Sequence, residues 1–337
     1  MISSFAGVQL VVIIFVFTPF ASFALFLRLW SRRIMNSHLT FSDYTAILAL
    51  ILTIGENTLC LIEAFIGISG VHVSEILATN PSLLPTYLKL ATPGIVLWGA
   101  ANTCVKLSIL SLYTTLFPNP KFQKVSYGTM VVSATFFIYV FLTAFVTCTP
   151  VQFNWDKSIP GGTCGQSVPF LVSGILNVVI DAFIVALPMP MLFNLQLSLY
   201  KKFSVAVMFS LGGVICIISL FRVISLHRWS QQDVTFGSAQ ISMFSTVEPT
   251  LGVVNACLPT IKPALYRICR KCGYYVSRTQ HKGTGKPGLE DNGRQNRMMA
   301  GIQYSPSHHF EDHIPLTIMQ SDNEVSGTSE RETTHPH

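Results

Sequence analysis

Seven long apolar runs constrain the fold of this chain more than any other feature. They lie at residues 5–27, 44–65, 87–117, 127–149, 168–192, 204–226 and 241–266. A helix needs about 20 mostly apolar residues to cross the roughly 30 Å hydrocarbon core of a bilayer. Continuous apolar runs also favour helices over the short alternating strands of a membrane barrel. The sequence therefore predicts an all-α membrane protein, a bundle of seven transmembrane helices.

The composition excludes a single soluble globular domain. Charged residues are 11% of the 337 residues, whereas ordinary soluble domains contain about 25%. The formal net charge is +6, but the basic residues come in ones and twos between apolar runs. Because they form no continuous basic stripe, we expect membrane lipids and not nucleic acid around this chain.

Lysine and arginine gather in every second loop, which predicts the orientation of the bundle. The loops 66–86, 150–167 and 227–240 contain together only Lys157 and Arg228. The intervening loops and the segment after the seventh run carry Arg28, Arg32, Arg33, Lys121, Lys124, Lys201, Lys202, Arg267, Arg270 and Lys271. The positive-inside rule places the N-terminus outside and the C-terminus in the cytosol.

The last 70 residues differ in composition from the rest. Residues 268–337 are rich in Gly, Ser, Thr, Asn, His and charge, which is typical of a disordered segment. We therefore expect two parts, a seven-helix membrane domain at 1–267 and a disordered cytoplasmic tail at 268–337. Cys269 and Cys272 begin this tail among basic residues, where palmitoylation and an unmodified pair are both open.

Two cysteines bracket a loop that the orientation rule places outside. Cys148 and Cys164 flank residues 150–163, and an oxidising compartment favours a disulfide between them. The sequence predicts that this bridge folds the loop over the extracellular mouth, with two free thiols as the alternative.

Several polar side chains fall inside the apolar runs. Charged groups within a membrane usually face the bundle interior and have a partner, so we expect Arg222 to meet Glu248 and Lys106 to reach Asp181 or the inner surface. The predicted polar interior consists of Trp98, Asn102, Lys106, Asn177, Asp181, Arg222 and Glu248. Glu56 and Glu63 share a face of the second run, and with Asp181 and Glu248 they are candidates for a cation path. Plain interhelical packing contacts are the alternative.

Two pairs of prolines lie at predicted inner helix ends. Pro188 and Pro190 lie at the inner end of the fifth run, and Pro259 and Pro263 lie at the inner end of the seventh. Proline removes a backbone donor and kinks a helix. These sites are predicted as helix hinges, with simple helix termination as the alternative.

Residues needed for known membrane chemistries are missing from the apolar runs. A retinal Schiff base needs a lysine near the middle of a span, and the seventh run has only Lys262 near its inner end. Before the tail the only histidines are His38, His72 and His227, which all fall at loops, and the sequence contains no GxSxG motif or phosphate-binding loop. We therefore expect no retinal, no other cofactor and no enzymatic activity.

Ordered motifs link the chain to a known family. They are Arg28 … Arg32-Arg33 … Ser42-Asp43-Tyr44, Gly70-Val71-His72, Lys106-Leu107-Ser108 … Tyr113, Cys148-x-Pro150 … Trp155-Asp156 … Cys164, Asn177 … Asp181 … Leu187-Pro188-x-Pro190, Phe209-x-x-Gly212 … Arg222, and Glu248 … Leu258-Pro259 … Lys262-Pro263. In this order they resemble the fungal rhodopsin-like family of seven-helix membrane proteins. Two positions depart from the family pattern, because Ser42 replaces a frequent acid and Thr115 replaces a frequent arginine.

The resemblance implies a receptor-like protein of the kind coupled to G proteins. We expect it to sense an unknown extracellular ligand, to signal to the cytosol through a heterotrimeric G protein, and to lie in the plasma membrane. Thr115 weakens the expectation of G-protein coupling. A transporter or channel is the alternative, although no internal repeat of the kind common in transporters is evident. A membrane scaffold that acts through its tail is a third interpretation.

Overall fold

The computed structural model describes residues 5–281 except 68, 81, 157–158, 166–167, 191–198 and 229–233. Within that part, the side chains of 77, 79, 199–206, 234–236 and 262–281 are not described. The predicted tail from residue 282 onward and the side chains of Cys269 and Cys272 therefore lie outside the described residues.

The chain is a bundle of long helices, as predicted. The helices are α1 (Phe5–Ile34), α2 (Phe41–Ile66), α3 (Val73–Thr79), α4 (Leu83–Leu116), α5 (Pro120–Val146), α6 (Val168–Ala186), α8 (Leu199–Arg228) and α9 (Val234–His281). A short hairpin, β1 (Cys148–Thr149) and β2 (Thr163–Cys164) with the 3-10 turn η1 (Val151–Asn154), links α5 to α6. In the described part, seven helices are long and apolar enough to cross a membrane.

The helix ends follow local sequence signals. Thr40 precedes α2 and forms a capping box with Asp43, and Gly67 ends this helix with a left-handed φ of 82°. Asn119 caps α5 through its side chain, and Pro120 occupies the first helical position, where no backbone donor is needed. These caps set the lengths of the loops at both ends of the bundle.

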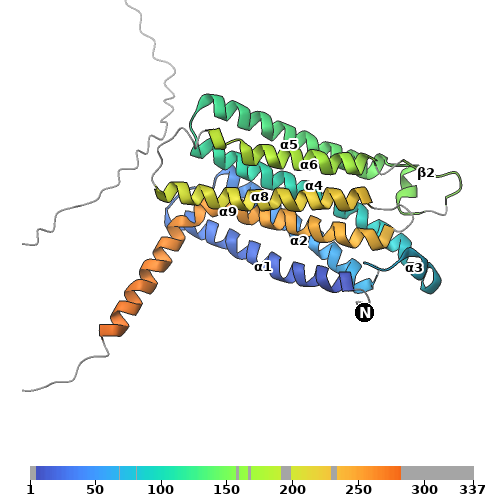
Figure 1. Cartoon of the computed structure of the whole chain (residues 1–337), viewed down its shortest axis with the longest axis horizontal. Helices are drawn as coiled ribbons and strands as arrows, with labels where there is room; N and C mark the ends of the chain where they lie inside the picture. The colour runs from blue at the N-terminus through green and yellow to red at the C-terminus, as the bar shows by residue number, and fades with distance from the viewer. Residues whose placement is uncertain are drawn as a thin grey trace, which may run out of the picture. The chain divides into compact units, whose positions relative to one another are not determined.

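Helix α4 lies at the centre of the packing. It contacts α2, α5 and α9, while α1 packs against α2 and α9, and α8 lies between α6 and α9. Figure 1 shows the long helices side by side, with α3 and the hairpin at the same end. We call this the hairpin end. Many large apolar side chains on α1, α2, α5, α6 and α8 face outward, as expected for helices surrounded by lipid.

Two sequence predictions need correction, and one alternative is excluded. Arg28, which we counted among the loop charges, lies inside α1 with no exposed side-chain surface. Helix termination, the alternative to a hinge at Pro259 and Pro263, does not occur there, because α9 continues through both to His281. Residues 268–281 are therefore helical and do not belong to a tail without regular structure. Each proline removes only one backbone hydrogen bond, and the turns on either side maintain the helix.

Helix α6, the fifth of the predicted spans, is shorter than the apolar run 168–192 that predicted it. Helix α6 ends at Ala186, and Leu187 and Pro188 form a turn. A residue that precedes proline is driven away from the helical region. The geometry at Pro188 therefore agrees with helix termination. The outside position of the hairpin end stays a prediction from the distribution of basic residues.

Candidate functional site: a cavity above a buried polar network

The hairpin end holds the predicted disulfide. Cys148 and Cys164 face each other across the two short antiparallel strands and form a disulfide bond. The strand pair positions η1, whose Asn154 side chain donates to the Phe145 carbonyl oxygen at 3.3 Å. The loop is thereby tied to the end of α5.

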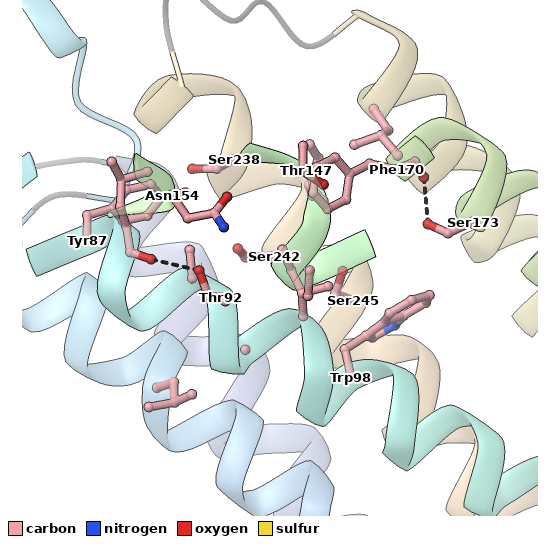
Figure 2. A pocket seen from close by; sticks show the side chains of 18 of the residues that line it. Tyr87, Thr92, Trp98, Thr147, Asn154, Phe170, Ser173, Ser238, Ser242 and Ser245 are labelled. Atoms are coloured by element: carbon pink, nitrogen blue, oxygen red, sulfur yellow. Dashed lines mark hydrogen bonds between the residues drawn. The ribbon is translucent and has the colours of Figure 1, made fainter. Parts of the chain in front are cut away.

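A cavity of about 390 Å³ lies below this hairpin. This volume falls within the range of small-molecule binding sites. Its walls come from α2, α4, α5, α6, α8, α9 and the hairpin. Figure 2 shows Tyr87 and Thr92 of α4, Asn154 of η1, and Ser242 and Ser245 of α9 around this space.

Arg222 of α8 forms part of the cavity lining, together with Trp98 of α4. The guanidinium carbon of Arg222 lies 3.5 Å from the centroid of the Trp98 ring, which is a cation–π contact. Its Nη1 atom donates to Glu248 Oε2 at 3.4 Å. Glu248 belongs to α9, so the cavity-lining Arg222 of α8 contacts both α4 and α9.

Beneath Arg222 the polar contacts continue across the bundle. Asn177 of α6 donates from Nδ2 to Glu248 Oε1 and, at 3.0 Å, to Asp181 Oδ2. Lys106 of α4 forms an ion pair with Asp181, and Ser219 of α8 donates to the same carboxylate at 3.4 Å. We define the central network as Arg222, Glu248, Asn177, Asp181, Lys106 and Ser219. It links α4, α6, α8 and α9.

The central network is not fully satisfied. Asn177 Oδ1 and Arg222 Nε have no hydrogen-bond partner, and neither do Glu56 Oε2 and Trp98 Nε1 at the adjoining cavity. Buried polar atoms in proteins are nearly always paired, and an unpaired one costs about 1–3 kcal/mol. The network therefore has free hydrogen-bonding capacity close to the cavity.

A second polar cluster, at the other end of the bundle, was not predicted from the sequence. Arg28 Nε donates to Asp43 Oδ1 at 2.8 Å, Nη2 to Ser42 Oγ at 2.7 Å, and Nη1 to the Ala256 carbonyl oxygen at 2.6 Å. Ser42 and Ser108 exchange hydrogen bonds between their hydroxyl and carbonyl groups at 2.7 Å. We define the Arg28 cluster as Arg28, Asp43, Ser42 and Ser108. It ties α1, α2, α4 and α9 together.

The structure brings together most of the predicted polar interior. Trp98, Lys106, Asn177, Asp181, Arg222 and Glu248 all belong to the central network or touch it. Asn102 is buried nearby and donates to the Trp98 carbonyl oxygen at 3.3 Å. Together with Lys106 and Asp181 it lines a second cavity of about 30 Å³, which has room for one or two water molecules.

The cavity lining includes residues that the sequence reasoning missed. Tyr87 and the serines Ser238, Ser242 and Ser245 all line it. The three serines are spaced i, i+4 and i+7, so they share one face of a helix. That periodicity was a signal for a polar face on the seventh span. Glu56 and Glu63 also line the cavity from α2, as their shared face predicted.

The fold and this site define a polytopic helical membrane protein with a ligand-sized cavity above an interior charge network. The family model for the fungal rhodopsin domain matches residues 27–267. The chain therefore belongs to the fungal rhodopsin family. No solved structure matches it.

Several curated fungal proteins are similar to this chain. The polyenoic acids biosynthesis gene cluster protein Ba17b of Metarhizium anisopliae is 25% identical over 78% of this chain and 75% of that protein. The SAT4 family membrane protein of Emericella nidulans is 26% identical over 64% of this chain and 55% of its own length. Receptor GIN3 of Arthrobotrys oligospora is 26% identical over 73% of this chain and 60% of its own length. The chain thus spans between about half and three quarters of these relatives.

Proposed function

We propose that this chain is a receptor that binds a small extracellular ligand in the cavity and signals occupancy to the cytosol. The observation that carries the proposal is the position of Arg222, which lines the cavity and also belongs to the central network. A ligand beside Arg222 acts on a group that already contacts two other helices. The basic residues of the alternate loops support an extracellular position for the cavity.

The charge network offers a path for the signal. A ligand shifts a conformational equilibrium only if it binds one state better than the other. A ligand that draws the Arg222 guanidinium toward the cavity weakens its pairing with Glu248, which also accepts from Asn177. Asn177 in turn contacts Asp181, the partner of Lys106. Movement at Arg222 therefore has consequences on α6, α9 and α4.

The comparisons favour a receptor at the level of the family. One relative is named as a receptor, Receptor GIN3 of Arthrobotrys oligospora. A heterotrimeric G protein is the proposed cytosolic partner, and the plasma membrane is the proposed location. We propose that the G protein binds at the cytosolic end of the bundle through residues other than Thr115.

Proximity labelling from the C-terminus of the full chain tests this function. The labelling enzyme is fused after His337 and the chain is expressed in fungal membranes, with and without fractionated extracellular metabolites. We expect a fraction-dependent change in labelling of G-protein subunits. Labelling that never changes with any fraction, or that lacks G-protein subunits throughout, contradicts the proposal.

A matched pair of variants links that response to the cavity. Ser242→Trp places a large side chain inside the cavity, whereas Val131→Trp places it on α5 at a side chain that is 66% exposed. We expect the first variant to lose the fraction-dependent change in labelling and the second to retain it. If both variants lose the fraction-dependent change in labelling, or if neither does, the response does not depend on the cavity and the proposal is contradicted.

A transporter is the second candidate function, and the two stacked cavities favour it. Glu56 and Glu63 line the upper cavity, and Asp181 and Glu248 line the lower one. Solute or ion flux into reconstituted vesicles, compared between the wild type and Asp181→Asn, tests this function. Flux that depends on Asp181 supports transport, and equal flux in both counts against it.

A further inference from the structure

The two acidic residues in the cavity lining differ in their surroundings. Glu56 is 3% exposed and Glu63 is 6% exposed, and both line the cavity from α2. The charge of Arg222 acts on Glu56 through space. In the described part of the chain, neither glutamate makes an ion pair or a side-chain hydrogen bond, and only Glu56 has a nearby positive charge. Glu63 lies seven positions further along α2, about 10 Å along the helix axis.

The buried carboxylate of Glu63 lacks a positively charged partner within the part of the protein that the structure describes. Burial of an ionised group is costly unless it is paired and hydrogen-bonded. Glu63 lies two turns closer to the hairpin end than Glu56, on the same helix. A cation that enters from the hairpin end therefore reaches Glu63 before it approaches the positive charge of Arg222.

The surroundings of Glu63 fit an organic ammonium group. Tyr87 lines the same cavity and interacts electrostatically with Glu63. It also shares a hydrogen bond with the Ser238 side chain. An aromatic ring beside a carboxylate is a favourable setting for an ammonium group. Deeper in the cavity, the walls include Leu59, Ile95 and Ile241, which suit an apolar body.

Other ligand classes fit less well. A bound metal ion needs several oxygen, nitrogen or sulfur ligands, and the described residues hold no group of three such side chains. An organic anion has only Arg222 to bind, and Arg222 already lies on Trp98 and donates to Glu248. A small anion deep in the cavity also meets the charge of Glu56.

We propose that the cavity binds an amphipathic organic amine, with its ammonium group at Glu63 and its apolar body toward Trp98. This inference rests on the proposed function, because it names the ligand class of the same cavity. Binding forms no covalent bond. The ligand supplies the counter-charge that the protein does not provide to Glu63, and its apolar part replaces water against the aliphatic wall.

Three probes of similar shape test the charge preference. The full chain in lipid nanodiscs is heated at neutral pH with increasing phenylbutylamine, phenylbutanol or phenylbutyrate, and Tm is followed against concentration. Nanodiscs that contain an unrelated membrane protein control for partition into lipid. We expect half-maximal stabilisation at a concentration about tenfold lower for the amine than for the other two. The inference is overturned if the alcohol or the carboxylate stabilises the protein at a lower concentration than the amine, or if no probe stabilises it.

Two conservative variants locate the ammonium group. Glu63→Gln keeps the shape of the side chain and removes its charge, so we expect the amine to bind about tenfold or more weakly. Glu75→Gln is the matched control, because Glu75 is an exposed acid of α3 that does not line the cavity, and we expect the amine to bind this variant as it binds the wild type. Without probe, Glu63→Gln is expected to unfold at the same or a higher temperature, because an unpaired buried charge is lost. Unchanged amine binding in Glu63→Gln overturns the assignment.

The results separate this inference from the proposed function. Amine binding without any change in cytosolic labelling supports the ligand class and counts against a receptor. A labelling response to the alcohol or the carboxylate in preference to the amine supports a receptor and overturns the ligand class.

Discussion

The Arg28 cluster and the central network are both buried sets of polar side chains, but they differ in how completely they are paired. In the Arg28 cluster, Arg28 donates to three different acceptors, and no buried side-chain atom of its four residues lacks a partner. In the central network, Asn177 Oδ1 and Arg222 Nε are unpaired. Cavities adjoin the central network on two sides.

This difference indicates different roles. A fully paired buried cluster gains nothing from a ligand and fixes the helices that contribute to it. A partly paired network next to open space has free energy to gain from a new partner or a new arrangement. We therefore interpret the Arg28 cluster as a structural joint of α1, α2, α4 and α9, and the central network as the part that responds to the cavity.

Loss of Arg28 is expected to have the largest effect on stability. Arg28→Met breaks the buried pair with Asp43, which keeps Arg32 at 3.2 Å and the Thr40 backbone amide as partners. We therefore expect a loss at the lower end of the about 3–5 kcal/mol that breaking a buried ion pair costs. Arg33→Met, on an exposed side chain of the same helix, is the matched control and should cost less than about 1 kcal/mol. Thermal unfolding in nanodiscs and the yield of monodisperse protein measure both. Similar values for the two variants would falsify the role of the cluster as a joint.

Loss of Lys106 is expected to have a smaller effect. Lys106→Met removes one partner of Asp181, which still accepts from Asn177 and Ser219, so we expect a loss of about 1–3 kcal/mol. Adding Asp181→Asn removes the unpaired charge and should recover part of that loss. A double-mutant cycle by thermal unfolding measures the coupling. Additive effects of the two substitutions contradict a direct pair.

The packing of α6 against α8 is tested at two adjacent glycines of α8. A Cβ atom at Gly212 meets Val185 Cγ2 of α6 at 2.8 Å, whereas one at Gly213 meets nothing within 4 Å. We expect Gly212→Ala to lose about 1–2 kcal/mol through overpacking. Gly213→Ala should be neutral or slightly stabilising, because alanine favours helix more than glycine does. Equal Tm values for the two variants contradict close contact of α6 and α8.

The smallest expected effect comes from a substitution that keeps the charge of Arg222. Arg222→Lys retains a cation for Glu248 but loses the planar group that stacks on Trp98. Such contacts contribute about 0.5–2 kcal/mol. The measurement is Tm together with the fluorescence of the buried Trp98, compared with Arg222→Gln. If Arg222→Lys lowers Tm more than Arg222→Gln does, the ion pair with Glu248 does not stabilise the protein.

The sequence predicted the architecture because the membrane imposes a simple length rule. Seven apolar runs predicted seven spans, and the intramembrane charges predicted Arg222 beside Glu248 and Lys106 beside Asp181, which the structure places as ion pairs. Two cysteines in a loop predicted their disulfide. Each of these inferences depends on the cost of an unpaired polar group in lipid or on the chemistry of one short loop.

Other features depend on tertiary contacts that a charge count does not detect. Arg28 follows an apolar run, as the loop arginines do. It is nevertheless buried, because the fold places Asp43 and the Ala256 carbonyl oxygen where they accept its hydrogen bonds. At Pro259 the sequence left a hinge and a helix end open, and only the structure shows that α9 continues through this residue. The cavity depends on seven different segments of the chain, so no local pattern predicts its presence or its volume.

Hydrogen–deuterium exchange of the full chain tests the central contrast most directly. Ser242→Trp fills the cavity from within, so its exchange in nanodiscs is compared with that of Val131→Trp on the outer face of α5. We predict altered exchange in the turns of α6 and α8 that contain Asp181 and Arg222, and unchanged exchange in the turn around Arg28. Identical exchange around Asp181 and Arg222 in the two variants, or a change confined to the turn around Arg28, would contradict the account.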